Sequence, residues 1–340
     1  MPAQRPDCPS KGRRAGIQDP KTSPVPDNRR KGYAAHRIPL TDTRQPTTRP
    51  TVGESRMKPE ADPAADQPSA NVPALALASR IDTTTTHSAR RYGYWLGGKD
   101  HFAADRESGD TIAAAFPHIR TAVRENRRFL HRAVTYLAGE VGIAQFLDIG
   151  TGIPTADNTH EVAQRITPTC RVVYADNDPI VLAHARALLT STPAGATAYL
   201  DADLRDPDQI LNHPDLAHTL DLGKPVALML IAILHFLTDA DDPYRIVAHL
   251  VDAMPPGSYL TVSHTTYDFM PADTIAALDA ATAHERFQAR TREQVARFFD
   301  GLDLVEPGIV TTTQWRPVPQ PEPQPTPMEA AAYAALARIP

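Results

Sequence analysis

The stretch FLDIGTGIPTADNTHEVAQ, residues 146–164, decides the fold. It begins with an apolar run that ends in an acid, Asp148, and continues into a turn with two glycines, Gly150 and Gly152. A polar helix start follows. An apolar strand, a glycine-bearing turn and a helix in direct succession are typical of a βαβ unit, whose first turn can hold a dinucleotide or a nucleoside.

From residue 145 onward, short β-rich runs alternate with helical stretches. The runs cover residues 145–149, 171–175, 197–200, 226–231 and 259–263, and the helical stretches cover 158–166, 179–189, 206–212, 242–254 and 273–287. Strands that alternate with helices predict a parallel, doubly wound sheet. The first strands are continuously apolar, as expected where helices cover both faces.

Two later segments, residues 302–315 and 331–339, could add further strands. The sequence therefore predicts an α/β, Rossmann-like, doubly wound sheet of seven strands, mostly parallel, with an antiparallel last strand. The predicted binding domain spans residues 143–340. An N-terminal helical cap is expected over residues 81–142, where apolar residues recur at helical spacing from Ile119 to Val141.

Residues 1–80 form a Pro- and Arg-rich tail that we expect to be disordered, because it holds too few apolar residues to offset its ordering entropy. Within it, Met57 is as good a translation start as Met1. Residues 1–58 carry 13 Lys and Arg against 5 Asp and Glu, a net +8 ahead of a body of −13. The acidic body argues against nucleic acid as a partner of the folded part.

The remaining composition excludes several classes of protein. No stretch approaches the roughly 20 apolar residues of a membrane span, and the longest apolar run covers residues 225–234. The two cysteines, Cys8 and Cys170, fit neither a disulfide framework nor a metal-ligand spacing. We therefore expect a cytoplasmic protein without a metal, and the oligomeric state stays open.

Acids follow three successive predicted strands, at Asp148, Asp176 and Asp203, and ligands of open α/β sheets bind at these carboxyl ends. An acid after the second strand can accept both hydroxyls of a ribose, and a further acid can accept an adenine amine. A dinucleotide instead needs a bare helix N-terminus for its pyrophosphate. Here the turn reads G-x-G-x-P and lacks the third glycine, so a nucleoside such as S-adenosylmethionine is favoured.

With these motifs in place, the sequence resembles the class I S-adenosylmethionine-dependent methyltransferases, and within them a bacterial family known as "S-adenosyl methyltransferase". The stretches that carry the resemblance are YGYWLGGKDHFAADRE, RENRRFLHRAVTYLA, QFLDIGTGIPTADNTHEVAQ, RVVYADNDPIVLAHARALL, YLDADLRDPDQIL, PVALMLIAILHFL and PPGSYLTVSH. The family usually has Asn where His101 stands, a departure on the expected substrate side.

The resemblance implies S-adenosylmethionine as cofactor and assigns roles to single residues. Asp148, Gly150 and Gly152 would frame its methionine part, and Thr151 in the same turn is a further cofactor-binding residue. Asp176 would hold the ribose with Asn177 beside it, and Asp203 and Leu204 would flank the adenine. Asp201 is the alternative for the adenine amine, because DAD can be registered either way.

Two stretches outside the strand ends leave alternatives open. YGYWLGG, residues 92–98, is either an aromatic cluster that seals the cap or a lid over the cofactor, with Gly97 and Gly98 as hinge and Tyr94 and Lys99 at the rim. On the helix after it, Arg124 and Asn126 could reach the cofactor carboxylate, and Arg127 and Arg128 are alternatives.

Methyl transfer is an in-line displacement that needs positioning and sometimes a general base. His235, His264 and Tyr92 are the candidate bases, and each histidine could equally be structural. The chain lacks an NPPY-type motif after the fourth strand and a cysteine at the cofactor side. We therefore expect a methyltransferase that acts on a small-molecule O- or N-acceptor. The alternative is a cofactor-binding regulator or partner protein without catalysis.

Overall fold

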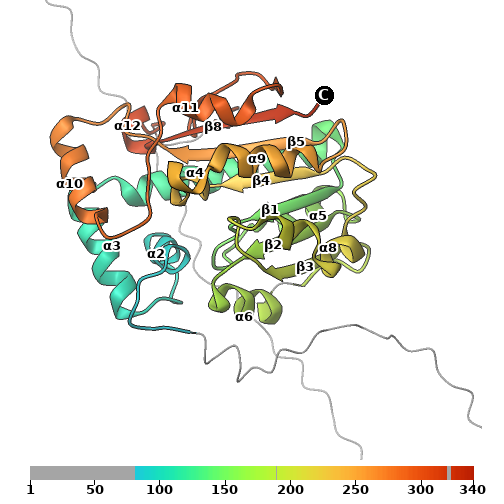
Figure 1. Ribbon diagram of the computed structural model, residues 1–340, viewed down its shortest axis with the longest axis horizontal. Coiled ribbons are helices and arrows are strands. Elements are labelled where there is room, and N and C mark those ends of the chain that lie inside the picture. The colour runs from blue at the N-terminus through green and yellow to red at the C-terminus, as the bar shows by residue number, and fades with distance from the viewer. Residues whose placement is uncertain (1–80, 189, 320–322) are drawn as a thin grey trace, which may run out of the picture. The chain divides into compact units, whose positions relative to one another are not determined.

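The structure is a computed structural model that describes residues 81–188, 190–319 and 323–340 (Figure 1). These residues all belong to one unit, residues 68–340. The predicted disordered tail, residues 1–80, lies outside the described residues. Within the described residues, every helix is too short or too polar to cross a membrane.

The core of the fold is one sheet with the strand order β3-β2-β1-β4-β5-β8-β6, and β7 pairs with β8. The strands are β1 (Gln145–Ile149), β2 (Arg171–Asp176), β3 (Ala196–Asp201), β4 (Ala227–Ile231), β5 (Tyr259–Thr265), β6 (Asp303–Leu304), β7 (Val310–Thr311) and β8 (Ala332–Arg338). β1 to β5 are parallel to their neighbours, and β8 runs antiparallel to β5. The order reverses between β1 and β4, which is where open α/β sheets bind ligands.

The predicted doubly wound sheet with its antiparallel last strand is therefore confirmed, but the number of strands is wrong. The sheet has eight strands, because the segment expected to be one strand over residues 302–315 forms two short ones. Pro307 and Gly308 separate β6 from β7. Proline has no N–H to give to a ladder, so a continuous strand through this position is disfavoured.

Helices connect the strands and form the cap. They are α2 (Ser88–Trp95), α3 (Ala103–Ala115), α4 (Ile119–Thr135), α5 (Thr159–Ile166), α6 (Pro179–Leu188), α7 (Pro207–Leu211), α8 (Pro214–Thr219), α9 (Pro243–Asp252), α10 (Ala272–Thr282), α11 (Arg292–Ala296) and α12 (Pro327–Ala330). A π-helix, η1 (Tyr136–Val141), follows α4 directly, and there are three short 3-10 helices, η2 (Leu234–Phe236), η3 (Asp239–Asp241) and η4 (Arg297–Phe299). The helix expected over residues 273–287 ends earlier, at Thr282.

Local sequence signals explain several helix boundaries. The backbone N–H of Asn158 donates to Glu161 Oε2 over 2.8 Å, which completes the capping box that opens α5. Thr291 and Gln294 make the equivalent pair at the start of α11. Gly142 ends η1 with φ +84°, a conformation that favours glycine.

Each face of the sheet buries its own apolar cluster, since successive side chains of a strand alternate between the faces. Leu147 and Ile149 of β1 pack on the face that α9 covers, whereas Phe146 packs on the face that α4 and α5 cover. A third, separate cluster joins α2, α3, α4 and α10. In Figure 1, α2, α3 and α10 lie beyond the carboxyl ends of the parallel strands.

Candidate functional site

A cavity of about 800 Å³ lies between the carboxyl ends of the parallel strands and the cap helices. It opens at the point where the strand order reverses, between β1 and β4. Most of the site residues predicted from the sequence line it, namely Tyr92, Asp148, Gly150, Thr151, Gly152, Asp176, Asn177, Asp203, Leu204, His235 and His264. The strand-end acids therefore meet in one cleft.

The turn after β1 requires glycine for two different reasons. Gly150 has φ +75°, and a Cβ placed on it would come within 2.5 Å of Ile233 Cγ1. Gly152 has φ +69°, and a Cβ on it would meet no atom within 4 Å. The first glycine therefore allows close packing against the segment after β4, and the second leaves open space at the cavity wall.

Asp176 joins the ends of β1 and β2. Its Oδ2 accepts the backbone N–H of Gly152 over 2.8 Å, and its Oδ1 accepts that of Asp178 over 2.9 Å. Burial raises the pKa of Asp176 despite these bonds. An ionised carboxylate has about four acceptor positions, so Asp176 can still receive hydroxyl donors from a ligand in the cavity.

Asp148 is buried beneath the glycine turn, where the Thr159 hydroxyl donates to its Oδ2 over 2.5 Å. Burial raises the pKa of Asp148 to about 6, and the bond from Thr159 only partly opposes this. The carboxyl group is thus about half protonated in mildly acidic solution, because burial removes the hydration that stabilises its ionised form.

Asp203 and Asn177 meet at the end of the cavity next to β3. Asn177 Nδ2 donates to Asp203 Oδ2 over 2.9 Å, and the backbone N–H of Arg205 donates to Oδ1 over 2.9 Å. Partial burial acts to raise the pKa of Asp203, but these bonds and the Arg205 guanidinium outweigh it and leave the pKa lowered. Asp203 lines the cavity, while its alternative, Asp201, is not among the lining residues.

The three candidate bases differ in how their polar atoms are engaged. Tyr92 donates its hydroxyl to the Val123 carbonyl over 3.1 Å and accepts from Asn126 over 2.9 Å, and burial raises its pKa. His264 shares Nδ1 with the Thr265 carbonyl over 2.8 Å, and its Nε2 lies 3.0 Å from Arg290 Nη1. Burial lowers the pKa of His264 to about 3. Both side chains are therefore fully occupied by protein partners.

His235 is engaged more weakly. Its Nδ1 lies 3.5 Å from the Thr265 hydroxyl, the longest distance among the contacts of these three candidates. Burial holds the pKa of His235 well below its usual value, and the neighbouring His264 and Arg290 add to the effect. A neutral imidazole at a cavity wall can accept a proton, so His235 is the candidate whose chemistry is still available.

Arg290 clamps the segment that carries His235, a feature that the sequence analysis missed. Its guanidinium donates to the carbonyls of Leu234 and Leu237, on either side of His235, over 3.2 and 3.0 Å. The guanidinium also pairs with Asp239 over 2.9 Å. No pattern in the sequence distinguishes Arg290 from the arginines near it, because the hydrogen-bond partners of its side chain lie between 26 and 56 residues away.

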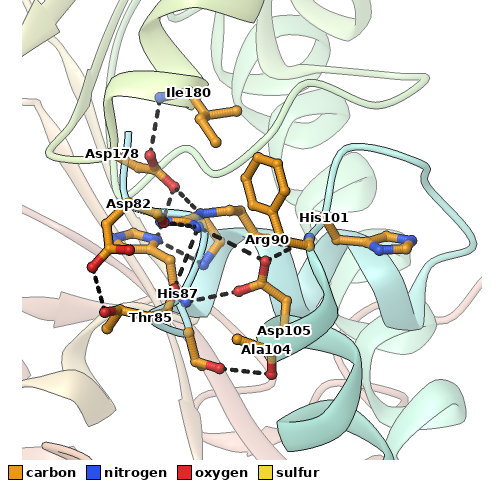
Figure 2. A network of polar contacts seen from close by, with 12 residues as sticks. Asp82, Thr85, His87, Arg90, His101, Ala104, Asp105, Asp178 and Ile180 are labelled. Carbon is orange, nitrogen blue, oxygen red and sulfur yellow. Dashed lines mark hydrogen bonds and ion pairs between the residues drawn. The ribbon is translucent and has the colours of Figure 1, made fainter. Parts of the chain in front are cut away.

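A second missed network ties the start of the cap to β2 (Figure 2). The fully buried Asp178 binds Arg90 Nε and His87 Nδ1, each over 3.1 Å, and also caps α6 by accepting the N–H of Ile180 over 2.9 Å. Arg90 Nη1 donates to the Asp82 carbonyl over 2.8 Å. The network thus anchors the chain before α2 next to the turn that holds Asp176.

Two predicted cofactor residues lie away from the cavity. Tyr94 and Gly97 are not among its lining residues. The Tyr94 hydroxyl donates to Asp110 over 2.7 Å, and Gly97 is exposed at the end of α2. The reason is the helical phase of α2, which turns Tyr92 and Trp95 inward and Tyr94 outward. Lys99 and His101 are not cavity residues either, so the departure at His101 does not affect the cavity wall.

The four polar residues considered on α4 also separate. Asn126 and Arg127 line the cavity, whereas Arg124 is exposed and Arg128 pairs with Glu125. Both polar atoms of the Asn126 side chain already have protein partners. Its Oδ1 accepts a hydrogen bond from the Ser263 hydroxyl over 2.5 Å, and its Nδ2 donates one to the Tyr92 hydroxyl. Arg127 bonds only to backbone carbonyls, which leaves its charge available to an anionic ligand group.

Across residues 81–188, 190–319 and 323–340, His, Cys, Asp and Glu form no cluster of three or more that could hold a metal ion. Cys170, the cysteine among these residues, is buried and free.

Comparisons with known proteins agree with this geometry. A family model described as S-adenosyl methyltransferase matches residues 75–340. The crystal structure of a DUF574 family protein from Streptomyces avermitilis MA-4680 is 48% identical, covers 77% of this chain and 100% of that chain, and has a TM-score of 0.74. A candidate methyltransferase from Thermobifida fusca YX is 43% identical, covers 76% and 96%, and has a TM-score of 0.69. Comparison with curated proteins gives no match.

Proposed function

The chain belongs to the S-adenosyl methyltransferase family, and from that premise we propose that it transfers a methyl group from S-adenosylmethionine to a small-molecule O- or N-acceptor in the cavity. Family membership makes the chain a methyltransferase and favours transfer over the binding-only alternative. The observation that supports the site most is the convergence of Asp148, Asp176 and Asp203 on one cavity with the glycine turn.

The cavity fits the cofactor at each of its parts. Asp176 keeps acceptor positions for two ribose hydroxyls, and Asp203 with Asn177 offers an acceptor and an amide beside the adenine. The open space at Gly152 suits a methionine chain that a Cβ would displace. Arg127 would face the carboxylate of that chain. The cofactor supplies an electrophilic methyl group on a sulfonium.

The protein's own contribution is positioning and removal of a proton. Methyl transfer breaks the S–C bond and forms an O–C or N–C bond, and the acceptor then loses its proton. His235 lines the cavity and makes only a long contact with Thr265, and burial keeps its imidazole neutral, so a ring nitrogen is free to take that proton. His264 and Tyr92 would act as structural partners instead, since their polar atoms are already bonded.

Calorimetric titration with S-adenosylhomocysteine tests the cofactor site. We expect Asp176→Ala to weaken binding at least about tenfold, the equivalent of about 1.4 kcal/mol. Asp208→Ala is the matched control, since Asp208 is an exposed acid on α7 that pairs with His249. Unchanged binding by Asp176→Ala would reject its assignment to the ribose, and a folded parent protein that takes up no ligand would reject the cofactor itself.

Transfer is tested by incubating the protein with methyl-labelled S-adenosylmethionine and, in separate reactions, the small-molecule and the macromolecular fractions of a cell extract. We expect the parent protein to produce labelled small molecules. The His235→Asn variant should form the same products at least about a hundredfold more slowly, a loss within the usual range for removal of a general base. Label found only in protein or nucleic acid would contradict a small-molecule acceptor.

A further inference from the structure

The apolar cluster of the cap encloses part of the cavity. All seven buried members of this third cluster, which include Ile112, Phe116 and Leu278, are also cavity-lining residues. They come from α2, α3, α4 and α10 and from the residue after α12 (Figure 1). An apolar cavity wall of this kind favours an apolar ligand, because a polar ligand would lose its hydration there.

Aromatic rings continue this wall toward the reacting groups. The ring of His235 lies 4.4 Å from that of Phe236 and 5.5 Å from that of Phe287, centroid to centroid, and Phe287 lies 6.4 Å from Tyr267. All four line the cavity. The segment that carries His235 also packs on the glycine turn through Ile233. The ring wall thus begins beside the expected position of the methionine part.

The charges on this wall are already neutralised. Arg91, almost fully buried, makes a two-pronged ion pair with Glu285, in which Nη2 lies 2.6 Å from Oε2. The Ser108 hydroxyl completes the pair by accepting from Arg91 over 2.8 Å. At the outer edge, Arg286 pairs with Asp241 over 2.8 Å. A charged ligand at the cap end would therefore lose its hydration without gaining an opposite charge.

We infer that the cap end of the cavity is the acceptor subsite, and that the acceptor is an uncharged, largely apolar ring compound with one hydroxyl or amine group. The apolar cap wall and the rings would hold the body of the molecule, and its polar group would lie at His235. This inference deepens the proposed function and rests on it, because it takes the strand-end acids to be occupied by the cofactor.

Three probes with the same ring test the inference on protein saturated with S-adenosylhomocysteine at neutral pH. They are β-naphthol, which is neutral, β-naphthoate, an anion, and β-naphthylmethylammonium, a cation. Calorimetry should show β-naphthol binding at least about tenfold more tightly than either ion, because only the ions lose hydration unpaired. Equal or tighter binding of an ion, or no binding of β-naphthol, would overturn the inference.

A variant pair places the probe in the cavity. Leu278→Glu puts a charge on the cap wall from α10, and Ala277→Glu puts the same charge on the exposed side of that helix. We expect at least a tenfold loss of β-naphthol binding for Leu278→Glu alone. Unchanged binding would overturn the assignment of the subsite. The order in which the three probes bind to the parent protein tests the inference even if the Leu278→Glu variant does not fold. Failure of S-adenosylhomocysteine to bind to the parent would instead reject the proposed function.

Discussion

Three glycine-to-alanine variants separate the effects of backbone strain, packing and ligand space at the glycines of the turn after β1, with Gly142, before β1, as the control. Gly142, Gly150 and Gly152 have φ of +84°, +75° and +69°, so alanine at each pays a similar cost of about 1–2 kcal/mol for the left-handed conformation. At Gly142 a Cβ meets nothing within 4 Å, and this residue precedes β1 at the end of the sheet away from the cavity. Gly142→Ala therefore measures the strain alone.

Gly150→Ala adds a collision. Its Cβ would lie 2.5, 2.7 and 2.8 Å from Ile233 Cγ1, Cδ1 and Cβ. Rotating the isoleucine side chain moves the first two atoms but not its Cβ, so the backbone of one segment must shift. Such overpacking costs about 1–3 kcal/mol, which makes the expected total about 2–5 kcal/mol.

Urea unfolding and titration with S-adenosylhomocysteine read out both effects. We expect the destabilisation to be larger for Gly150→Ala than for Gly142→Ala by about 1–3 kcal/mol. Gly152→Ala should lose no more stability than Gly142→Ala, yet bind the ligand at least about tenfold more weakly, since its methyl group would occupy ligand space at the cavity wall. Equal stability of Gly150→Ala and Gly142→Ala, or normal binding by Gly152→Ala, would refute the reasoning.

Three further predictions concern charges. The pKa of Asp148 is about 6 in the folded protein against 3.8 ordinarily, so the native state holds the proton more tightly than the unfolded state does. The free energy of unfolding therefore falls as pH rises from about 4 to 6. Asp148→Asn should remove this fall and be about 3 kcal/mol more stable than the parent at pH 7, as measured by urea unfolding. Arg290→Met should slow methyl transfer at least about tenfold and leave S-adenosylhomocysteine affinity within about twofold, and it should move the acidic limb of the rate profile to higher pH, because the guanidinium lowers the pKa of His235. Arg90→Met removes a buried partner of Asp178 and should lower the free energy of unfolding by about 3–5 kcal/mol, as measured by thermal or urea unfolding. Unchanged stability would mean that His87 alone is enough to pair with Asp178.

Much of the sheet could be predicted because its signals are local. Apolar runs of strand length and the glycine turn predicted β1 to β5 in order. The division of residues 302–315 into β6 and β7 was not predicted, because both strands are two residues long and form only by pairing with β8. Such short segments have no periodicity of their own, so tertiary pairing decides them.

The site could be predicted only where the sheet itself places the residues. Parallel strands bring their carboxyl ends to one edge, and this brought Asp148, Asp176 and Asp203 together. The cap obeys no such rule. Tyr92 and Tyr94 are two residues apart, and only the phase of α2 decides which of them faces the cavity. The partners of Arg90 and Arg290 are likewise set by how distant segments pack.

The two histidines at the ends of β4 and β5 illustrate the same limit and its consequence for catalysis. His235 lies shortly after β4 and His264 lies near the end of the adjacent strand β5, so the sequence offers no ground for choosing between them. Their rings lie 5.6 Å apart. Arg290 makes the choice, because its guanidinium occupies Nε2 of His264 and an arginine can only donate there. His264 must therefore stay neutral, with its proton on the nitrogen nearer the Thr265 carbonyl. The same guanidinium holds the carbonyls of Leu234 and Leu237, before and after His235, and leaves the His235 ring to the cavity. Under the proposed function, one buried arginine thus gives His264 a structural role and leaves His235 for proton transfer.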